Sequence, residues 1–187
     1  MKFIFSLSLL LTFWLPSSAQ RVAGDSNKTG QSAASLKPVI TYEFSEGPAY
    51  KIYISSDRTL VYEGIEGVKT KGKITTKITD IQFQQLMEAF KNAGFSSLRN
   101  SYNLKNGCTS GTSDSAWVTI TLRSGTSVKS IDHYLGCYGG NTKFVRGLTA
   151  LTRLEKRIHN ILNIEQWIGT EEERSMLPDP RLILKKR

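Results

Sequence analysis

The sequence predicts an α+β domain: an antiparallel sheet of about six strands with two helices packed on one face. Two observations carry this prediction. Short segments rich in β-branched and aromatic residues precede a helical segment, and the same order then recurs. Residues 38–74 would supply four strands, 79–94 a helix, 117–134 a hairpin and 142–162 a longer helix. A run of strands followed by one helix favours α+β over the regular alternation of a parallel sheet.

The first three strands are marked by apolar, β-branched runs between turn residues. We expect strands over 39–44 (VITYEF), 50–54 (YKIYI) and 59–63 (TLVYE). The dipeptide Gly-Pro separates the first two, and the segment SSDR separates the next two, as in hairpin turns.

A fourth strand is expected over Val68–Ile74, with lysines at alternate positions. Because side chains on a strand alternate between its faces, Lys69, Lys71 and Lys73 would share one face. Three ammonium groups in a row form a possible anion-binding stripe. They would equally serve as solvated charges that keep an edge strand from pairing with another sheet, and we favour that interpretation.

Caps and apolar periodicity define the two helices. Thr79 with Gln82 three residues later is a capping box, and Gly94 is typical of a helix end. The longer helix is predicted over Thr142–Leu162 from apolar residues at helical spacing. Its basic side chains lie largely outside that apolar stripe: Arg153, Lys156 and Arg157.

Two cysteines, Cys108 and Cys137, lie in glycine-containing loops on either side of the predicted hairpin. In an exported chain a disulfide between them would persist, and closing this loop would add about 3–4 kcal/mol of stability. A reactive or metal-bound pair with His133 is the alternative, because two thiols and an imidazole can hold zinc. The C-x-x-C spacing of redox enzymes is absent, so we expect a structural disulfide, no metal and no cofactor.

Polar side chains at the end of the hairpin form a possible binding loop: Asp132, His133, Tyr134 and Tyr138. A nucleophilic triad would also need a serine or cysteine held against His133, and no spacing selects one. His159, on the second helix, has an ordinary structural role in our interpretation. We therefore assign no catalytic residue.

The N-terminal segment 1–19 has the three parts of a secretory signal peptide. Lys2 precedes an apolar run over 3–15, and small residues, Ser17 and Ala19, precede the expected cleavage site. The run is shorter than the ~20 residues that span a bilayer. We expect export to the periplasm or outside the cell, as a monomer that does not span the membrane.

Composition divides the rest of the chain. Residues 20–37 are small and polar, which predicts a flexible leader; 38–169 form a single domain; and 170–187 are a basic C-terminal tail. The formal net charge is +9. Because an exported protein seldom meets nucleic acid, we expect an envelope protein or an anionic envelope component as partner. The charge would equally serve only to keep the domain soluble. The sequence has no phosphate loop, dinucleotide fingerprint, HExxH or GxSxG, which excludes the enzyme classes that depend on them.

The order and spacing of these elements resemble a family of small bacterial exported domains, domain of unknown function 6438. The matching segments are ITYEF, YKIYISSDRTLVYEG, VKTKGKIT, ITDIQFQQLMEAFKNAGFSSLRNSY, IDHYLGC and LTRLEKRIHNILNIEQWIG. Many members have a C-x-G-x-C-P loop before the second strand, where residues 45–50 here are SEGPAY. No role of that cysteine pair transfers, and the resemblance implies fold and export but no activity.

We therefore expect a binding or interaction module of the cell envelope rather than an enzyme. Two alternatives stay open: a thiol- or metal-dependent enzyme using Cys108, Cys137 and His133, and a structural envelope protein. A free-thiol count with metal analysis would separate the first of these from a binding module.

Overall fold

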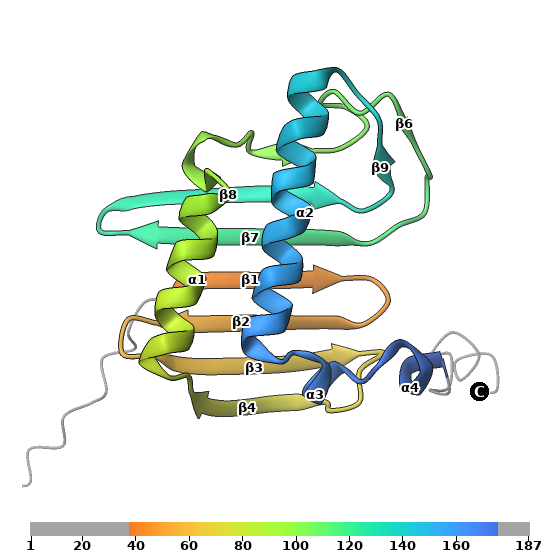
Figure 1. The fold of residues 1–187 in the computed structure, drawn as a ribbon. Coiled ribbons are helices and arrows are strands. Elements are labelled where there is room, and N and C mark those ends of the chain that lie inside the picture. Colours follow the sequence, from red (N-terminus) through yellow and green to blue (C-terminus); the bar gives the residue numbers. More distant parts are fainter. Residues whose placement is uncertain (1–37, 176–187) are drawn as a thin grey trace, which may run out of the picture. The chain divides into compact units, whose positions relative to one another are not determined.

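The computed structural model describes residues 38–175, in which seven strands form one sheet in the order β4-β3-β2-β1-β7-β8-β5 (Figure 1). The first four strands form an antiparallel meander: β1 (Pro38–Ser45), β2 (Ala49–Ser55), β3 (Thr59–Glu66) and β4 (Gly72–Lys77). The meander follows the three apolar runs and the turns seen in the sequence.

The second half of the sheet joins the first through β7 (Trp117–Ser124), which pairs antiparallel with β1. β8 (Ser127–Tyr134) forms the expected hairpin with β7, and β5 (Ser101–Tyr102) lies parallel to β8 at the edge. A separate two-stranded sheet pairs β6 (Ser110–Gly111) with β9 (Cys137–Tyr138). The main sheet therefore has one strand more than the six that were predicted. The additional strand is β5, which was missed because two residues are too few to show a periodicity.

Two long helices, α1 (Asp80–Asn92) and α2 (Thr142–Leu162), lie side by side across one face of the sheet (Figure 1). Three short helices were not predicted: a 3₁₀ turn over Phe95–Ser97, α3 (Glu165–Ile168) and α4 (Glu171–Ser175). The α+β class and the placement of the long helices are as expected.

Local capping explains where the long helices begin. The Thr79 hydroxyl accepts a bond from the Gln82 backbone N–H at 3.1 Å, and the Gln82 side-chain oxygen accepts one from the Thr79 N–H at 2.9 Å. This confirms the predicted capping box. Asn141 caps α2 by accepting from the Phe144 N–H at 2.9 Å, and Asn163 ends it with a left-handed φ of 49°.

The core lies between the helices and the sheet. Alternate strand residues point into it, among them the tyrosines Tyr42, Tyr50 and Tyr62, which are at most 1% exposed. Leu151 and Ile158 of α2 meet this layer and are fully buried. Burying each such side chain contributes roughly 1.5–3 kcal/mol to the free energy of unfolding. The contact between the helices and the sheet therefore stabilises the domain.

The opposite face of the sheet carries charges in a cross-strand row. Glu43, Lys51, Glu63 and Lys73 follow one another across β1 to β4. Lys51 pairs with Glu43 at 2.9 Å and Lys73 with Glu63 at 3.5 Å. These charges neutralise one another, so this face presents no unbalanced row of lysines.

The fourth strand begins at Gly72 rather than Val68, which corrects the prediction. Gly67 and Gly72 have φ of 61° and 88°, in the left-handed region, and the segment between them forms a loop. Val68 enters the core, and the Lys69 backbone N–H donates to the Ile168 carbonyl of α3 at 3.2 Å. Docking on α3 therefore replaces sheet pairing over these residues.

The structure describes only part of the terminal segments that the sequence predicts. The signal peptide 1–19, the leader 20–37 and residues 176–187 lie outside the described residues. The segment expected as a tail from residue 170 begins with helix α4. Among residues 38–175, no helix is long and apolar enough to cross a membrane.

Candidate functional site

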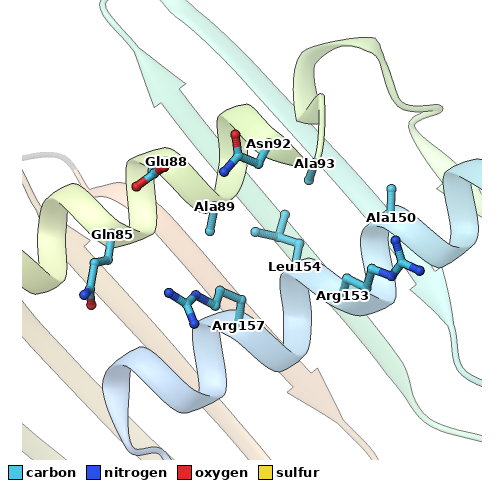
Figure 2. Close-up of a pocket in the computed structure, with 9 residues that line it drawn as sticks. All are labelled: Gln85, Glu88, Ala89, Asn92, Ala93, Ala150, Arg153, Leu154 and Arg157. Carbon is cyan, nitrogen blue, oxygen red and sulfur yellow. The ribbon is translucent and has the colours of Figure 1, made fainter.

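A groove of about 480 Å³ runs along the outer side of the helix layer, between α1 and α2. Figure 2 shows Ala89 of α1 and Leu154 of α2 pointing toward one another across it. Ala93 and Ala150 add two further small side chains to the lining. Because alanines occupy these positions, the two helices leave a hollow where larger side chains would fill the space.

Two arginines of α2 line this groove. Arg153 and Arg157 are four residues apart, so they lie on the same side of the helix, and both are exposed. Figure 2 shows Arg157 extending toward α1. Neither guanidinium forms an ion pair with any residue in the described part of the chain. Each is a planar fork of N–H donors that matches a carboxylate or phosphate group.

The remaining polar lining comes from α1. Gln85 and Asn92 contribute side-chain amides, and Glu88 contributes the one carboxylate of the groove. The balance of the lining is two positive charges against one negative charge. An anion placed on the α2 side, away from Glu88, would meet the strongest positive potential.

The rest of α2 strengthens this potential. Its other basic residues are also exposed: Lys143, Arg146 and Lys156. Its single carboxylate, Glu155, is only 7% exposed and faces the interior. The exposed ionic side chains of α2 are therefore all basic.

On its other side, α2 holds a buried pair. Glu155 Oε1 lies 2.7 Å from Nδ1 of His133 on β8, and both side chains are buried. A carboxylate removed from water needs such a partner, because an unpaired buried charge is strongly unfavourable. His133 is thus a partner inside the fold rather than part of an exposed loop.

His159, one turn further along α2, meets two tyrosines. Its Nε2 lies 2.8 Å from the Tyr50 hydroxyl and 3.1 Å from the Tyr42 hydroxyl. Burial, with a smaller effect of the positive charge of Arg174, lowers the pKa of His159 to about 4. Burial raises the pKa of Tyr42 and Tyr50 above the ordinary tyrosine value. The three groups therefore form a neutral hydrogen-bonded cluster at pH 7.

An open cleft of about 370 Å³ lies beside this cluster, between α2, the sheet and the start of α3. Phe44, Val118 and Leu135 give it an apolar lining from the sheet side. The other lining residues are polar or titratable: Tyr42, Thr152, Glu155, Lys156, His159, Asn160 and Glu165. The groove and the cleft thus flank the same helix on opposite sides.

The structure places Cys108 and Cys137 at disulfide-bonding distance, with Cα atoms 5.8 Å apart. Both are buried, and they lie beside the β6–β9 pair. Next to them the Thr112 N–H donates to the Gly136 carbonyl at 2.9 Å. The two loops that flank the β7–β8 hairpin therefore meet, as their positions in the sequence predict.

The four residues of the possible binding loop do not converge. Asp132 and Tyr134 point to the face of the sheet opposite His133, because neighbouring strand residues alternate. The Thr119 hydroxyl donates to the Asp132 carboxylate at 2.9 Å, and the Tyr134 hydroxyl donates to the Thr112 carbonyl at 2.8 Å. The fourth member is exposed on β9: Tyr138.

The three lysines of the possible anion stripe do not share one strand. Lys69 lies in the loop before β4 and pairs with Glu173 at 2.7 Å. Lys71 precedes β4 in the same loop, and Lys73 lies on β4, opposite Glu63. The stripe depended on a strand from residue 68, which the Gly67–Gly72 loop replaces.

Residues 38–175 contain no group of three or more His, Cys, Asp and Glu side chains that could hold a metal ion. His133 bonds to Glu155, and the two cysteines lie at bonding distance from each other. The described residues thus do not assemble the three-residue site that the enzyme alternative requires.

The groove was not predicted, although part of its signal was present. Arg153 and Arg157 lie outside the apolar stripe at a spacing of one helical turn. The missing information was which residues of α1 face them, because that depends on how the two helices pack.

The chain matches a known family over most of the described residues. A family model described as a domain of unknown function (DUF6438) matches residues 42–162, from β1 to the end of α2. No curated protein matches the chain.

Proposed function

Because the chain belongs to the DUF6438 family, which is described only as a domain of unknown function, we propose its function from the site itself. We infer that it is a binding module that takes an anionic ligand in the groove between α1 and α2. Arg153 and Arg157 are the residues that bind the anion.

The observation that carries this proposal is the pair of unpaired guanidiniums above a hollow lined with alanines. Hydrogen bonds to charged groups contribute about 1.5–3 kcal/mol each, more than bonds between neutral groups. A ligand with two carboxylate or phosphate groups would engage both arginines at once. Gln85 and Asn92, on the opposite wall, would donate to its remaining oxygens.

The predicted signal peptide supports a location outside the cytoplasm. There the net positive charge and the exposed basic residues of α2 favour an anionic component of the cell envelope as the ligand. In this proposal the protein binds and does not catalyse, and the disulfide pair serves the stability of the domain.

A charge-matched pair of variants tests the groove. Arg153→Gln with Arg157→Gln removes two positive charges that line it. Lys143→Gln with Arg146→Gln removes two positive charges from the same helix, at positions that do not line it. Titration calorimetry with pyrophosphate and with citrate would measure the affinity of each variant for these two anions.

We expect the groove variant to bind at least about tenfold more weakly, and the matched control to lose less than about threefold. Equal losses would mean that binding follows net charge alone, and the proposal of a groove site would then be wrong.

A further inference from the structure

We propose that the cleft on the other side of α2 is a second binding site, and that its ligand is a small amine: an ammonium group on an apolar body. This site shares no lining residue with the groove, so the inference does not rest on the function proposed above.

The cleft has the form of a small-molecule site. Its volume of about 370 Å³ lies in the range typical of ligand pockets. Phe44, Val118 and Leu135 provide an apolar floor, and polar side chains converge on it from one side, along α2 and the start of α3. Such a floor suits an aliphatic or aromatic ligand body, and the polar wall would fix the head group.

The charges in the lining favour a cationic head group. Its ionic side chains are two carboxylates, Glu155 and Glu165, against one ammonium, Lys156. His159 also lines the cleft but is neutral at pH 7, so it adds no positive charge. Arg174 acts on His159 but does not line the cleft.

Glu155 is the acceptor at the inner end. Its Oε1 is bonded to His133, which fixes the carboxyl group, while its Oε2 has no hydrogen-bond partner among the described residues. This oxygen is not a buried atom without a partner but is accessible from the cleft, where an ammonium N–H would donate to it with matching charge.

Two aromatic residues contribute to the apolar part of the cleft. Tyr42 and Phe44 belong to the lining, and both of their rings stack against Tyr50, which holds them in place. An anionic head group would meet both carboxylates. The combination of carboxylates and apolar floor therefore selects an amine over an acid of the same shape.

Three probes with the same ring and different head groups test this: 2-phenylethylamine, 2-phenylethanol and 3-phenylpropanoate. The full chain with ¹³C-labelled methyl groups would be titrated with each, following the methyl signals of Val118 and Leu135. We expect the amine to shift these signals with a Kd at least about tenfold below that of the alcohol, and the acid to shift them least. The inference is overturned if the alcohol or the acid binds as tightly as the amine, or if the amine leaves these signals unmoved.

Substitutions at two exposed positions test whether the cleft prefers a positive or a negative ligand, and they do not disturb the core. Glu165→Gln should weaken amine binding by about threefold or more, and Lys156→Gln should strengthen it by about twofold or more, because it removes a like charge. The reverse pair of effects would assign the cleft to an anion and overturn the inference. Unchanged affinity in both variants would place the amine elsewhere and overturn it equally.

The groove variant Arg153→Gln with Arg157→Gln serves as the independence control, and it should leave amine affinity within about twofold of the wild type. A larger loss would mean that the amine binds through the groove side of α2, which contradicts a separate site. Failure of the amine to bind would leave the anion titrations of the groove unaffected.

Discussion

The two sides of α2 differ in whether their polar and charged side chains have partners within the protein. Toward α1, Arg153 and Arg157 are exposed and have no ionic partner within the described residues. Toward the sheet, Glu155 and His159 are matched at short distance by His133 and by tyrosine hydroxyls. The difference indicates that the polar groups buried by α2 are held by contacts that the fold needs, whereas its exposed arginines are free to bind an anion in the groove.

The effect of a substitution on the free energy of unfolding should also differ between the two sides of α2. Breaking a buried pair by removing one partner costs several kcal/mol, because the other partner stays behind without compensation. Replacing an exposed charge that touches no partner changes stability by less than about 0.5 kcal/mol. Stability and anion binding in the groove should therefore respond to different substitutions on one helix.

The largest effect is expected from the buried pair. Glu155→Ala should lower the free energy of unfolding by about 2–5 kcal/mol, because it removes a buried side chain and leaves His133 without its hydrogen-bond partner. Urea unfolding followed by circular dichroism would measure it. Arg157→Ala, two residues away on the exposed side, is the control and should change stability little. Equal effects of the two substitutions would remove the distinction between the sides.

The cysteine pair provides the next test. Replacing Cys108 and Cys137 by serine should lower stability by about 2–4 kcal/mol, because the 29-residue separation is no longer closed. Anion binding in the groove should survive at temperatures where the variant is folded. A count of free thiols in the unfolded wild type would check the bond, and two free thiols would refute it.

His159 predicts a pH dependence. Its pKa is about 4 in the folded protein and 6.5 in the unfolded chain, so the unfolded state binds the extra proton between these values. The contribution of His159 to stability is therefore complete above pH 6.5 and is lost as the pH falls toward 4, by roughly 2–3 kcal/mol.

His159→Gln is the matched variant, because its amide can still bond a tyrosine hydroxyl but does not titrate. Urea unfolding of both proteins between pH 4 and 7.5 should give a smaller slope for the variant. Identical slopes would show that His159 takes up its proton in the folded state as easily as in the unfolded chain.

Much of the fold could be predicted, because its signals are local. The bounds of α2 follow from its apolar period, and the start of α1 follows from the Thr79–Gln82 capping box. The β7–β8 hairpin follows from alternation around Ser124 and Gly125. Each of these depends on residues within a few positions of one another.

The errors in the fold have tertiary causes. β4 starts late because the loop before it docks on α3, about a hundred residues further along the chain. β5 and β6 are two residues long and exist only because β8 and β9 lie beside them. No short window of sequence contains that information.

Part of the candidate site could be predicted from the sequence and part could not. The inward position of His133 was available from the sequence, since it shares a strand face with Ile131 and not with Asp132. The groove was not available, because Ala89 and Leu154 meet only when α1 and α2 pack together (Figure 2).

The smallest effect on stability, and the most direct test, concerns the groove arginines. Wild type and the Arg153→Gln, Arg157→Gln variant would be unfolded in urea with and without pyrophosphate at 100 times the wild-type Kd. Without ligand, the variant should be within about 0.5 kcal/mol of the wild type. With ligand, the wild type should gain about 2.7 kcal/mol, and a variant that binds tenfold more weakly about half of that. An equal gain in both proteins, or a variant that is unstable without ligand, would contradict the assignment of binding to the exposed side of α2.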